Sequence, residues 1–175
     1  MKTYTLFLLI LPVFLCAQMS PDVIDPGFTF DRLNPSSLSQ TVAGFEPETF
    51  YPSTVRVVVL EAATLKKGVQ VQRLSATGTL QMKGSTRSIT GIMIADKQGI
   101  SPVPTPNVGS NLKISPLSTP ATFPDPTNVK LFVAVPASAL ANAQGAVLDL
   151  VVSAIVQEPG KRSYTRIAKV TVKNL

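Results

Sequence analysis

The sequence predicts an all-β protein, and three observations support that prediction. Apolar and polar residues alternate along several short segments, a pattern typical of strands with one buried face. Gly, Pro and Ser fill the stretches between these segments, as turns require. Helical periodicity is confined to one short stretch. We therefore expect about seven strands and one short helix, arranged either as an antiparallel, lipocalin-like barrel or as an immunoglobulin-like sandwich.

The alternation is clearest in 76–83 and in 147–157, where every second residue is apolar or small. In the first segment these residues are Ala76, Gly78, Leu80 and Met82, and in the second Leu148, Leu150, Val152, Ala154 and Val156. The segment 163–172 follows 147–157 after Pro159-Gly160, which predicts a C-terminal hairpin. Further strands are expected at 54–61, 68–74, 87–95 and 129–135.

The remaining segments predict irregular structure, apart from one helix. A short helix is expected at 136–144, because Pro136 would lie in its first turn and Gly145 follows its end. The segment 101–128 is rich in proline, which removes ladder donors, so we predict a long loop there. A second irregular stretch is expected at about 18–50.

The opening residues 1–17 have the pattern of a secretory signal peptide. Lys2 precedes an apolar stretch, and Ala17 offers a small residue before the cleavage point. We therefore predict that residues 18–175 form a single β domain that is secreted or periplasmic and not transmembrane. The alternative is a lipid anchor on Cys16, the only cysteine.

The residue types that remain after cleavage exclude several kinds of chemistry. The chain has no His and no Trp, and its one Cys lies in the predicted signal. Disulfides, zinc sites built from His or Cys, and triads built on imidazole are therefore excluded. The sequence also lacks a dense Asp/Asn/Gly calcium loop and a Gly-rich phosphate loop. We expect no enzyme activity, no cofactor and no metal.

Two patterns that could support hydrolysis are interpreted as chance matches. Ser110 and Lys113 have the Ser-x-x-Lys spacing of some serine acyl enzymes, but they lie in the Pro-rich segment without companion motifs. Carboxylate pairs suited to glycoside hydrolysis would lie in irregular sequence, so we expect surface acids instead. These pairs are Glu46 with Glu48, and Asp22 with Asp25 or Asp31.

The net charge of +6 is concentrated near the C-terminus. After Glu158 the charged residues are all basic: Lys161, Arg162, Arg166, Lys169 and Lys173. This pattern could bind an acidic partner, but we interpret it as the solvated face of a last strand whose lysines protect a sheet edge. Nucleic-acid binding is not expected, because exposed aromatic residues accompany it and Tyr164 alone is present here.

The segment 76–90 resembles the late hairpin of the YceI-like family, a group of exported lipocalin-like barrels. The matching positions are Gly78, Leu80, Met82, Lys83, Gly84, Thr86, Arg87 and Ile89. Their order also fits a strand that ends at Lys83, a turn at Gly84 and a second strand that starts near Arg87. The resemblance implies a barrel that holds an isoprenoid or similar apolar chain, and no ligand contact carries over to individual residues.

Two functions therefore remain open, and a hydrolase ranks below both. The first is an exported, non-enzymatic protein that binds an isoprenoid or lipid chain inside a β-barrel. The alternative is a structural or adhesive envelope module, a β-sandwich that binds an envelope or surface partner and no small molecule. Inward apolar faces look the same in both, so only the structure distinguishes them.

Overall fold

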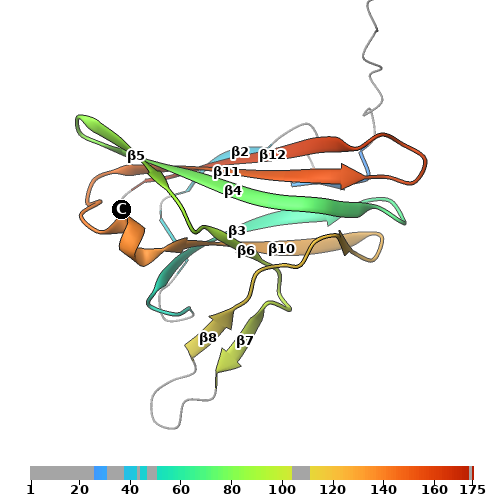
Figure 1. Ribbon diagram of the computed structural model, residues 1–175, viewed down its shortest axis with the longest axis horizontal. Coiled ribbons are helices and arrows are strands. Elements are labelled where there is room, and N and C mark those ends of the chain that lie inside the picture. Colours follow the sequence, from blue (N-terminus) through green and yellow to red (C-terminus); the bar gives the residue numbers. More distant parts are fainter. Residues whose placement is uncertain (1–25, 31–37, 43, 47–50, 104–110, 174) are drawn as a thin grey trace, which may run out of the picture.

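The computed structural model describes residues 26–30, 38–42, 44–46, 51–103, 111–173 and 175. Within these residues the chain is nearly all β-structure, as the sequence predicts. The strands form two stacked sheets that do not close into a barrel (Figure 1). The predicted signal peptide lies outside the described residues. Among the described residues, no helix has the length and apolar character needed to cross a membrane.

The smaller sheet has four strands, and the larger has six. In spatial order, the smaller contains β1 (Phe28–Thr29), β3 (Val55–Thr64), β10 (Thr127–Pro136) and β6 (Met93–Ala95). The larger contains β2 (Leu38–Val42), β12 (Tyr164–Val172), β11 (Val147–Gln157), β4 (Gln70–Met82) and β5 (Ser85–Ile89), with β9 (Ala121–Thr122) beside the other end of β4. All pairings are antiparallel except that of β2 with β12.

This strand order is that of an immunoglobulin-like sandwich. The order β1-β3-β10-β6 corresponds to strands A-B-E-D, and β4-β11-β12 corresponds to C-F-G. Of the two architectures that the sequence leaves open, the structure therefore has the sandwich. A separate hairpin of β7 (Ile100–Val103) and β8 (Asn111–Ile114) projects below the smaller sheet in Figure 1.

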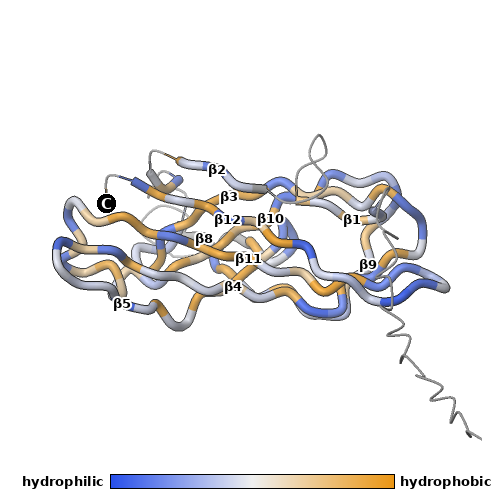
Figure 2. The backbone as a smooth tube through the Cα atoms, turned by 90° about the horizontal axis from the view of Figure 1, so that it is seen from above, coloured by the Kyte–Doolittle hydropathy of each residue, from blue (hydrophilic) through white to orange (hydrophobic). Residues whose placement is uncertain are grey.

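The core between the sheets is aliphatic. The predicted inward face of β11 is buried throughout, and β10 contributes Val133 and Val135 with no exposed surface. Figure 2 shows that the middle of β10 and β11 is coloured mostly as hydrophobic. Antibody domains join their two sheets by a disulfide packed on a Trp, whereas this sandwich depends on close packing of Leu, Val and Ala.

The predicted strands 68–74 and 76–83 are one strand, β4, so the prediction of a break between them is wrong. The apolar positions change phase between Val71 and Leu74, which suggests two strands from sequence. In the structure, β11 residues Ile155 and Val156 pair with Arg73 and Val71, so that Gln72 is the extra residue of a β-bulge. A bulge inverts the facing of all later residues without ending the strand.

Two other boundaries also differ from prediction. The expected strand 87–95 divides into β5 and β6, because the chain turns at Gly91 (φ 75°) to pass from one sheet to the other. The expected helix 136–144 is only a 3₁₀ turn, Ala137–Leu140. Its length is too short for an α-helix that lacks strong tertiary support.

The two segments predicted to be irregular also contain strands. The Pro-rich segment includes most of the β7–β8 hairpin and β9, and the early stretch includes β1 and β2. Pro102 is accommodated because β7 is an edge strand, which does not need every backbone donor. Strand β8 covers part of the outer face of the smaller sheet, where Ile114 packs with Val55, Val57 and Ala134.

Candidate functional site

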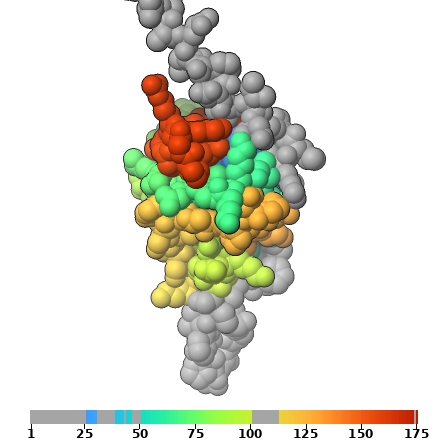
Figure 3. Space-filling view, turned by 90° about the vertical axis from the view of Figure 1, so that its right-hand side faces the viewer, coloured from blue at the N-terminus to red at the C-terminus, as the bar shows by residue number. Residues whose placement is uncertain are grey.

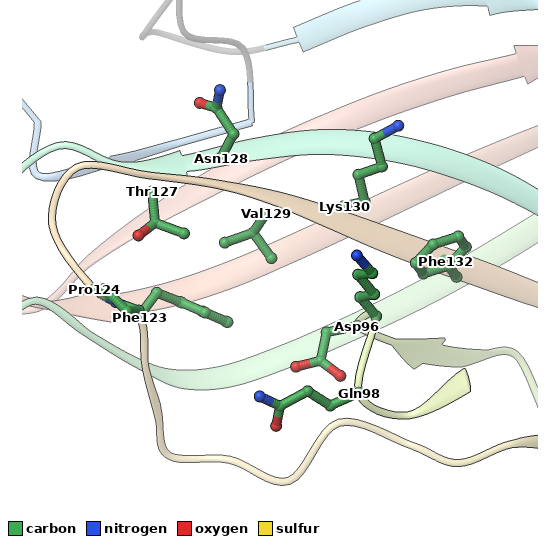
Figure 4. A pocket seen from close by; sticks show the side chains of 10 residues that line it. Asp96, Gln98, Phe123, Pro124, Thr127, Asn128, Val129, Lys130 and Phe132 are labelled. Carbon is green, nitrogen blue, oxygen red and sulfur yellow. The ribbon is translucent and has the colours of Figure 1, made fainter. Parts of the chain in front are cut away.

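The candidate site is a groove of about 780 Å³ along one edge of β10 (Figure 4). One wall is the turn Asp96–Gln98, which follows β6 directly. The other wall comes from Phe123 and Pro124, just before β10. The floor and rim are formed by β10 itself, through Thr127, Asn128, Val129, Lys130 and Phe132.

The groove exists because β6 is much shorter than β10. The register pairs Phe132 with Ala95, and β6 ends there. The chain then leaves the sheet at Asp96, where the carboxylate Oδ1 accepts the Gly99 N–H at 2.9 Å and closes the turn. Within the described part of the chain, no strand pairs with β10 at Val129 to Leu131 on this side.

One hydrogen bond fixes which backbone groups of β10 point into the groove. The Ile94 carbonyl accepts the Leu117 N–H at 2.8 Å, on the side of β6 away from β10. In an antiparallel ladder successive residues direct their N–H and C=O to opposite sides. Phe132 and Ala134 therefore pair with β6, and Lys130, two residues before Phe132, directs its N–H and C=O to the same side.

A hydrogen bond on the other side of the smaller sheet, at β3, gives the same directions for the backbone groups of β10. The Val57 carbonyl accepts the Glu46 N–H at 2.8 Å, so Val57 directs its backbone away from β10. Its partner in the register is Ala134, which must then direct its backbone toward β6. Both edges thus place the Lys130 N–H and C=O on the open side.

The side chains around this edge are apolar inside and basic outside. Val129 is buried in the main core, and Phe123 packs against that core from the groove wall. Lys97 and Lys130 are exposed, and among the described residues neither forms an ion pair. The Asp96 carboxylate is engaged by the turn. The groove therefore offers an apolar floor, two exposed ammonium groups and a strand edge.

The hairpin singled out by the sequence lies at the other end of the sandwich, where β4 and β5 meet. Gly78 pairs with Ile89 and Leu80 with Arg87, and the strands join through Lys83-Gly84. The remaining motif positions, Met82 and Thr86, flank this turn. Leu80 is fully buried and Ile89 nearly so, whereas Arg87 donates to the Ala139 carbonyl at 2.6 Å. The eight positions therefore form a structural hairpin, away from the groove.

Gly84 provides a test of this structural role. Its φ of 80° is a conformation that L-residues avoid, although Asn tolerates it in two-residue turns. We expect Gly84→Val to lower the free energy of unfolding by about 1–2 kcal/mol. Gly84→Asn should cost much less, because the surroundings of Gly84 are open. Urea denaturation of both variants measures the difference, and equal losses would contradict the turn geometry.

The catalytic patterns considered from sequence do not come together in the described residues. Ser110, Glu48, Asp22, Asp25 and Asp31 lie outside them. Glu46 is exposed beside β3, and Lys113 lies on β8. Among the described residues, no group of three or more His, Cys, Asp or Glu side chains is placed to hold a metal ion.

The basic C-terminal residues are not a single surface. Lys161 pairs with Glu158, and the Arg166 guanidinium lies 5.2 Å from the centre of the Tyr164 ring. Lys169 and Lys173 are exposed on or just after β12. The expected edge-strand role is wrong for the second half of β12, because β2 pairs along it from Ala168 to Val172.

A second polar cluster joins three segments at the end of the sandwich, and no sequence pattern indicates it. Figure 3 looks onto this end, with the red β11–β12 turn above the green β3–β4 turn. Glu158 is buried, and its Oε1 accepts the Gly27 N–H and the Tyr164 hydroxyl, both at 2.8 Å. Its Oε2 lies 3.3 Å from Lys161 Nζ and 3.6 Å from Lys66 Nζ.

The partners of Glu158 determine the protonation of this cluster. Burial alone would raise the pKa of the Glu158 carboxyl, but hydrogen bonds from Gly27, Tyr164 and Lys161 and the charge of Lys66 hold it below 4.5. The pKa of Tyr164 is raised well above 10, by burial first and then by its bond to the Glu158 carboxylate. At neutral pH the cluster therefore contains a carboxylate and a neutral phenol. Its hydrogen bonds and ion pairs hold the three segments together, which is a structural role.

Comparison with known proteins gives only distant structural similarity. No family model matches the chain, and no curated protein matches it. One similar solved structure is a family 123 glycoside hydrolase from Clostridium perfringens, at TM-score 0.36 and 14% identity over 82% of this chain; the match spans 24% of the hydrolase. Another is AggA, the major subunit of aggregative adherence fimbriae type I from Escherichia coli, at TM-score 0.29 and 14% identity, covering 78% of this chain and 91% of AggA. Similarities this low identify no shared function.

Proposed function

We propose that this chain is an exported, non-enzymatic interaction module, a β-sandwich that binds a protein partner at the envelope or cell surface. The open edge of β10 beside the groove is the observation that carries the proposal. Exposed strand edges are sites where another polypeptide can add to a sheet, and folded proteins normally pair or cover them. Here the edge is open beside an apolar floor.

The filled interior favours this function over transport of an apolar chain. An isoprenoid carrier needs a lumen that side chains leave empty. Between these two sheets the space is occupied by residues such as Leu80, Leu148 and Val152, each with no exposed surface. The resemblance of 76–90 to YceI-like hairpins remains a proposal about ancestry, and it supplies no ligand site in this sandwich.

The residue types support a role without catalysis. The chain has no His, and its one Cys lies in the predicted signal. The groove contains two lysines and one aspartate, and that aspartate is held by a backbone N–H. Such a set can attract and orient a partner but offers no nucleophile with an adjacent base.

Site-specific crosslinking in the native host tests the proposal. With p-benzoylphenylalanine in place of Lys130, we expect ultraviolet light to join the chain to a partner protein, visible as a discrete larger band by immunoblot. The same group in place of Thr86, exposed on the distant β4–β5 hairpin, is the control and should give no such band. No protein adduct at Lys130, together with an apolar chain in organic extracts of the native protein, would support the carrier instead.

A further inference from the structure

We infer that the groove binds an extended, acidic segment of a partner protein, which adds as a strand to the open edge of β10. This inference rests on the proposed function and specifies the partner's chemistry. It commits to strand addition, which requires three things: backbone groups that point outward, room beside them, and side chains that select the occupant.

The backbone requirement is met at Lys130. The hydrogen bonds of Ile94 and Val57 show that the Lys130 N–H and C=O point into the groove. The N–H and C=O of Phe132, which pair with β6, point to the same side. An added strand would continue the line that β6 leaves at Ala95. Beyond Phe132, which pairs with Ala95, β10 offers about 13 Å of edge from Leu131 back to Thr127, at roughly 3.3 Å per residue.

The room requirement is met by the groove itself. Its volume is about 780 Å³, and the turn Asp96–Gln98 and the pair Phe123-Pro124 bound it beside β10 (Figure 4). The turn closed by Asp96 and Gly99 carries the chain away from the line of β6. The groove is therefore a slot beside the strand edge and not merely a hollow in a loop.

The side chains predict an alternating sequence in the occupant. Residues opposite one another in neighbouring strands share a face of the sheet. An occupant residue opposite Val129 would point inward toward Phe123, where an apolar side chain fits. Its neighbours would point outward beside Lys130 and Lys97, where carboxylates fit.

Charge also discriminates between possible occupants. An antiparallel second copy of the same edge would bring its own Lys130 close to the first, and like charges across a strand pair are destabilising. Edge lysines are a common protection against such self-pairing. An acidic segment would instead place carboxylates beside Lys130 and Lys97, and the net charge of +6 favours its approach. Two acids already lie nearby, Asp96 in the groove wall and Glu61 opposite Lys130 on β3.

Peptide binding to the purified domain tests the inference. The probe is a blocked peptide of about six residues that alternates valine and glutamate, labelled through a Gly-Ser spacer. Fluorescence anisotropy should show saturable binding. Two control peptides should each bind at least about tenfold more weakly. One has lysine in place of glutamate, and the other is N-methylated at the amides that would face β10.

Variants of the domain identify the site. Lys97→Glu combined with Lys130→Glu should reverse the preference, so that the lysine peptide binds better than the glutamate peptide. Lys83→Glu is the matched control: it reverses an exposed charge at the distant β4–β5 turn and should leave the affinity unchanged. Hydrogen exchange should show protection of the Lys130 amide only when the glutamate peptide is bound.

Three outcomes would overturn the inference. Equal binding of the N-methylated peptide would exclude strand addition, and an unchanged preference in the double variant would exclude selection by these lysines. A concentration-dependent dimer that the peptide dissociates would make a second copy the occupant. If a partner protein still crosslinks at Lys130 in any of these cases, the proposed function survives and only the acidic strand is lost.

Discussion

Val152→Asp should abolish folding of this domain. Val152 lies in the middle of β11 with no exposed surface, between Ala76 of β4 and Ala168 of β12. A carboxylate there would have neither water nor a partner, and the lost valine packing adds to the cost. The expected loss exceeds about 4 kcal/mol, a large part of the stability of a typical domain. Circular dichroism and urea denaturation measure it.

Ser153→Asp is the matched control, one residue along the same strand. Ser153 points to the opposite face, between Ser75 and Ile167, where solvent reaches it. We expect a change within about 0.5–1 kcal/mol, because a charge on this face stays hydrated. If both variants are equally stable, β11 does not bury the face that contains Val152.

The inward face of β11 could be predicted from sequence because local pattern alone determines it. Alternation over eleven residues leaves one choice of buried face, and the turn at Pro159-Gly160 fixes the hairpin. The bulge at Gln72 could not be predicted in the same way. A phase change in the apolar pattern is equally consistent with a break or a bulge, and only pairing with the partner strand, β11, decides between them.

The groove was missed because it depends on the lengths of two strands that are distant in sequence. Nothing near Lys130 shows that β6 ends opposite Phe132, because that register is set by tertiary pairing. Two sequence signals existed. The run Asp96 to Gly99 has turn-forming residues that could have ended a strand at Ala95, and the Pro-rich segment signalled an unusual connection.

The Glu158 cluster was also invisible in the sequence, since its members come from three separate segments. Gly27 approaches so closely that a Cβ there would lie 2.5 Å from Val69 Cγ2 and 3.0 Å from the Glu158 carboxyl carbon. Only glycine allows this approach. The Tyr164 hydroxyl also connects β1 to this cluster, because it accepts the Phe28 N–H at 3.2 Å while it donates to Glu158. The first strand is thereby fixed to the last hairpin.

Glu158→Gln should remove a pH-dependent part of this stability. The variant keeps the shape of the side chain but loses the charge that Lys66 and Lys161 neutralise. At pH 7 the free energy of unfolding should fall by about 1.5–3 kcal/mol, the range for a hydrogen bond to a charged group. Glu61→Gln, which makes the same change at an exposed position of β3, should cost less than about 1 kcal/mol.

The pH dependence of stability distinguishes the charge interactions of Glu158 from simple packing. Because the folded pKa of Glu158 lies below 4.5, the native protein gains stability from it above pH 4.5 and loses that gain as the pH falls through the lowered folded value. The difference between the native protein and Glu158→Gln should therefore be constant from about pH 5 to about pH 8 and shrink in acid. Tyr164, with a raised pKa, should contribute a separate loss above pH 10, which Tyr164→Phe removes. Urea denaturation at pH values from about 2 to above 10 measures how the free energy of unfolding changes in both regions. A difference between the native protein and Glu158→Gln that persists unchanged at pH 2 would show that Glu158 acts through packing and not through its charge.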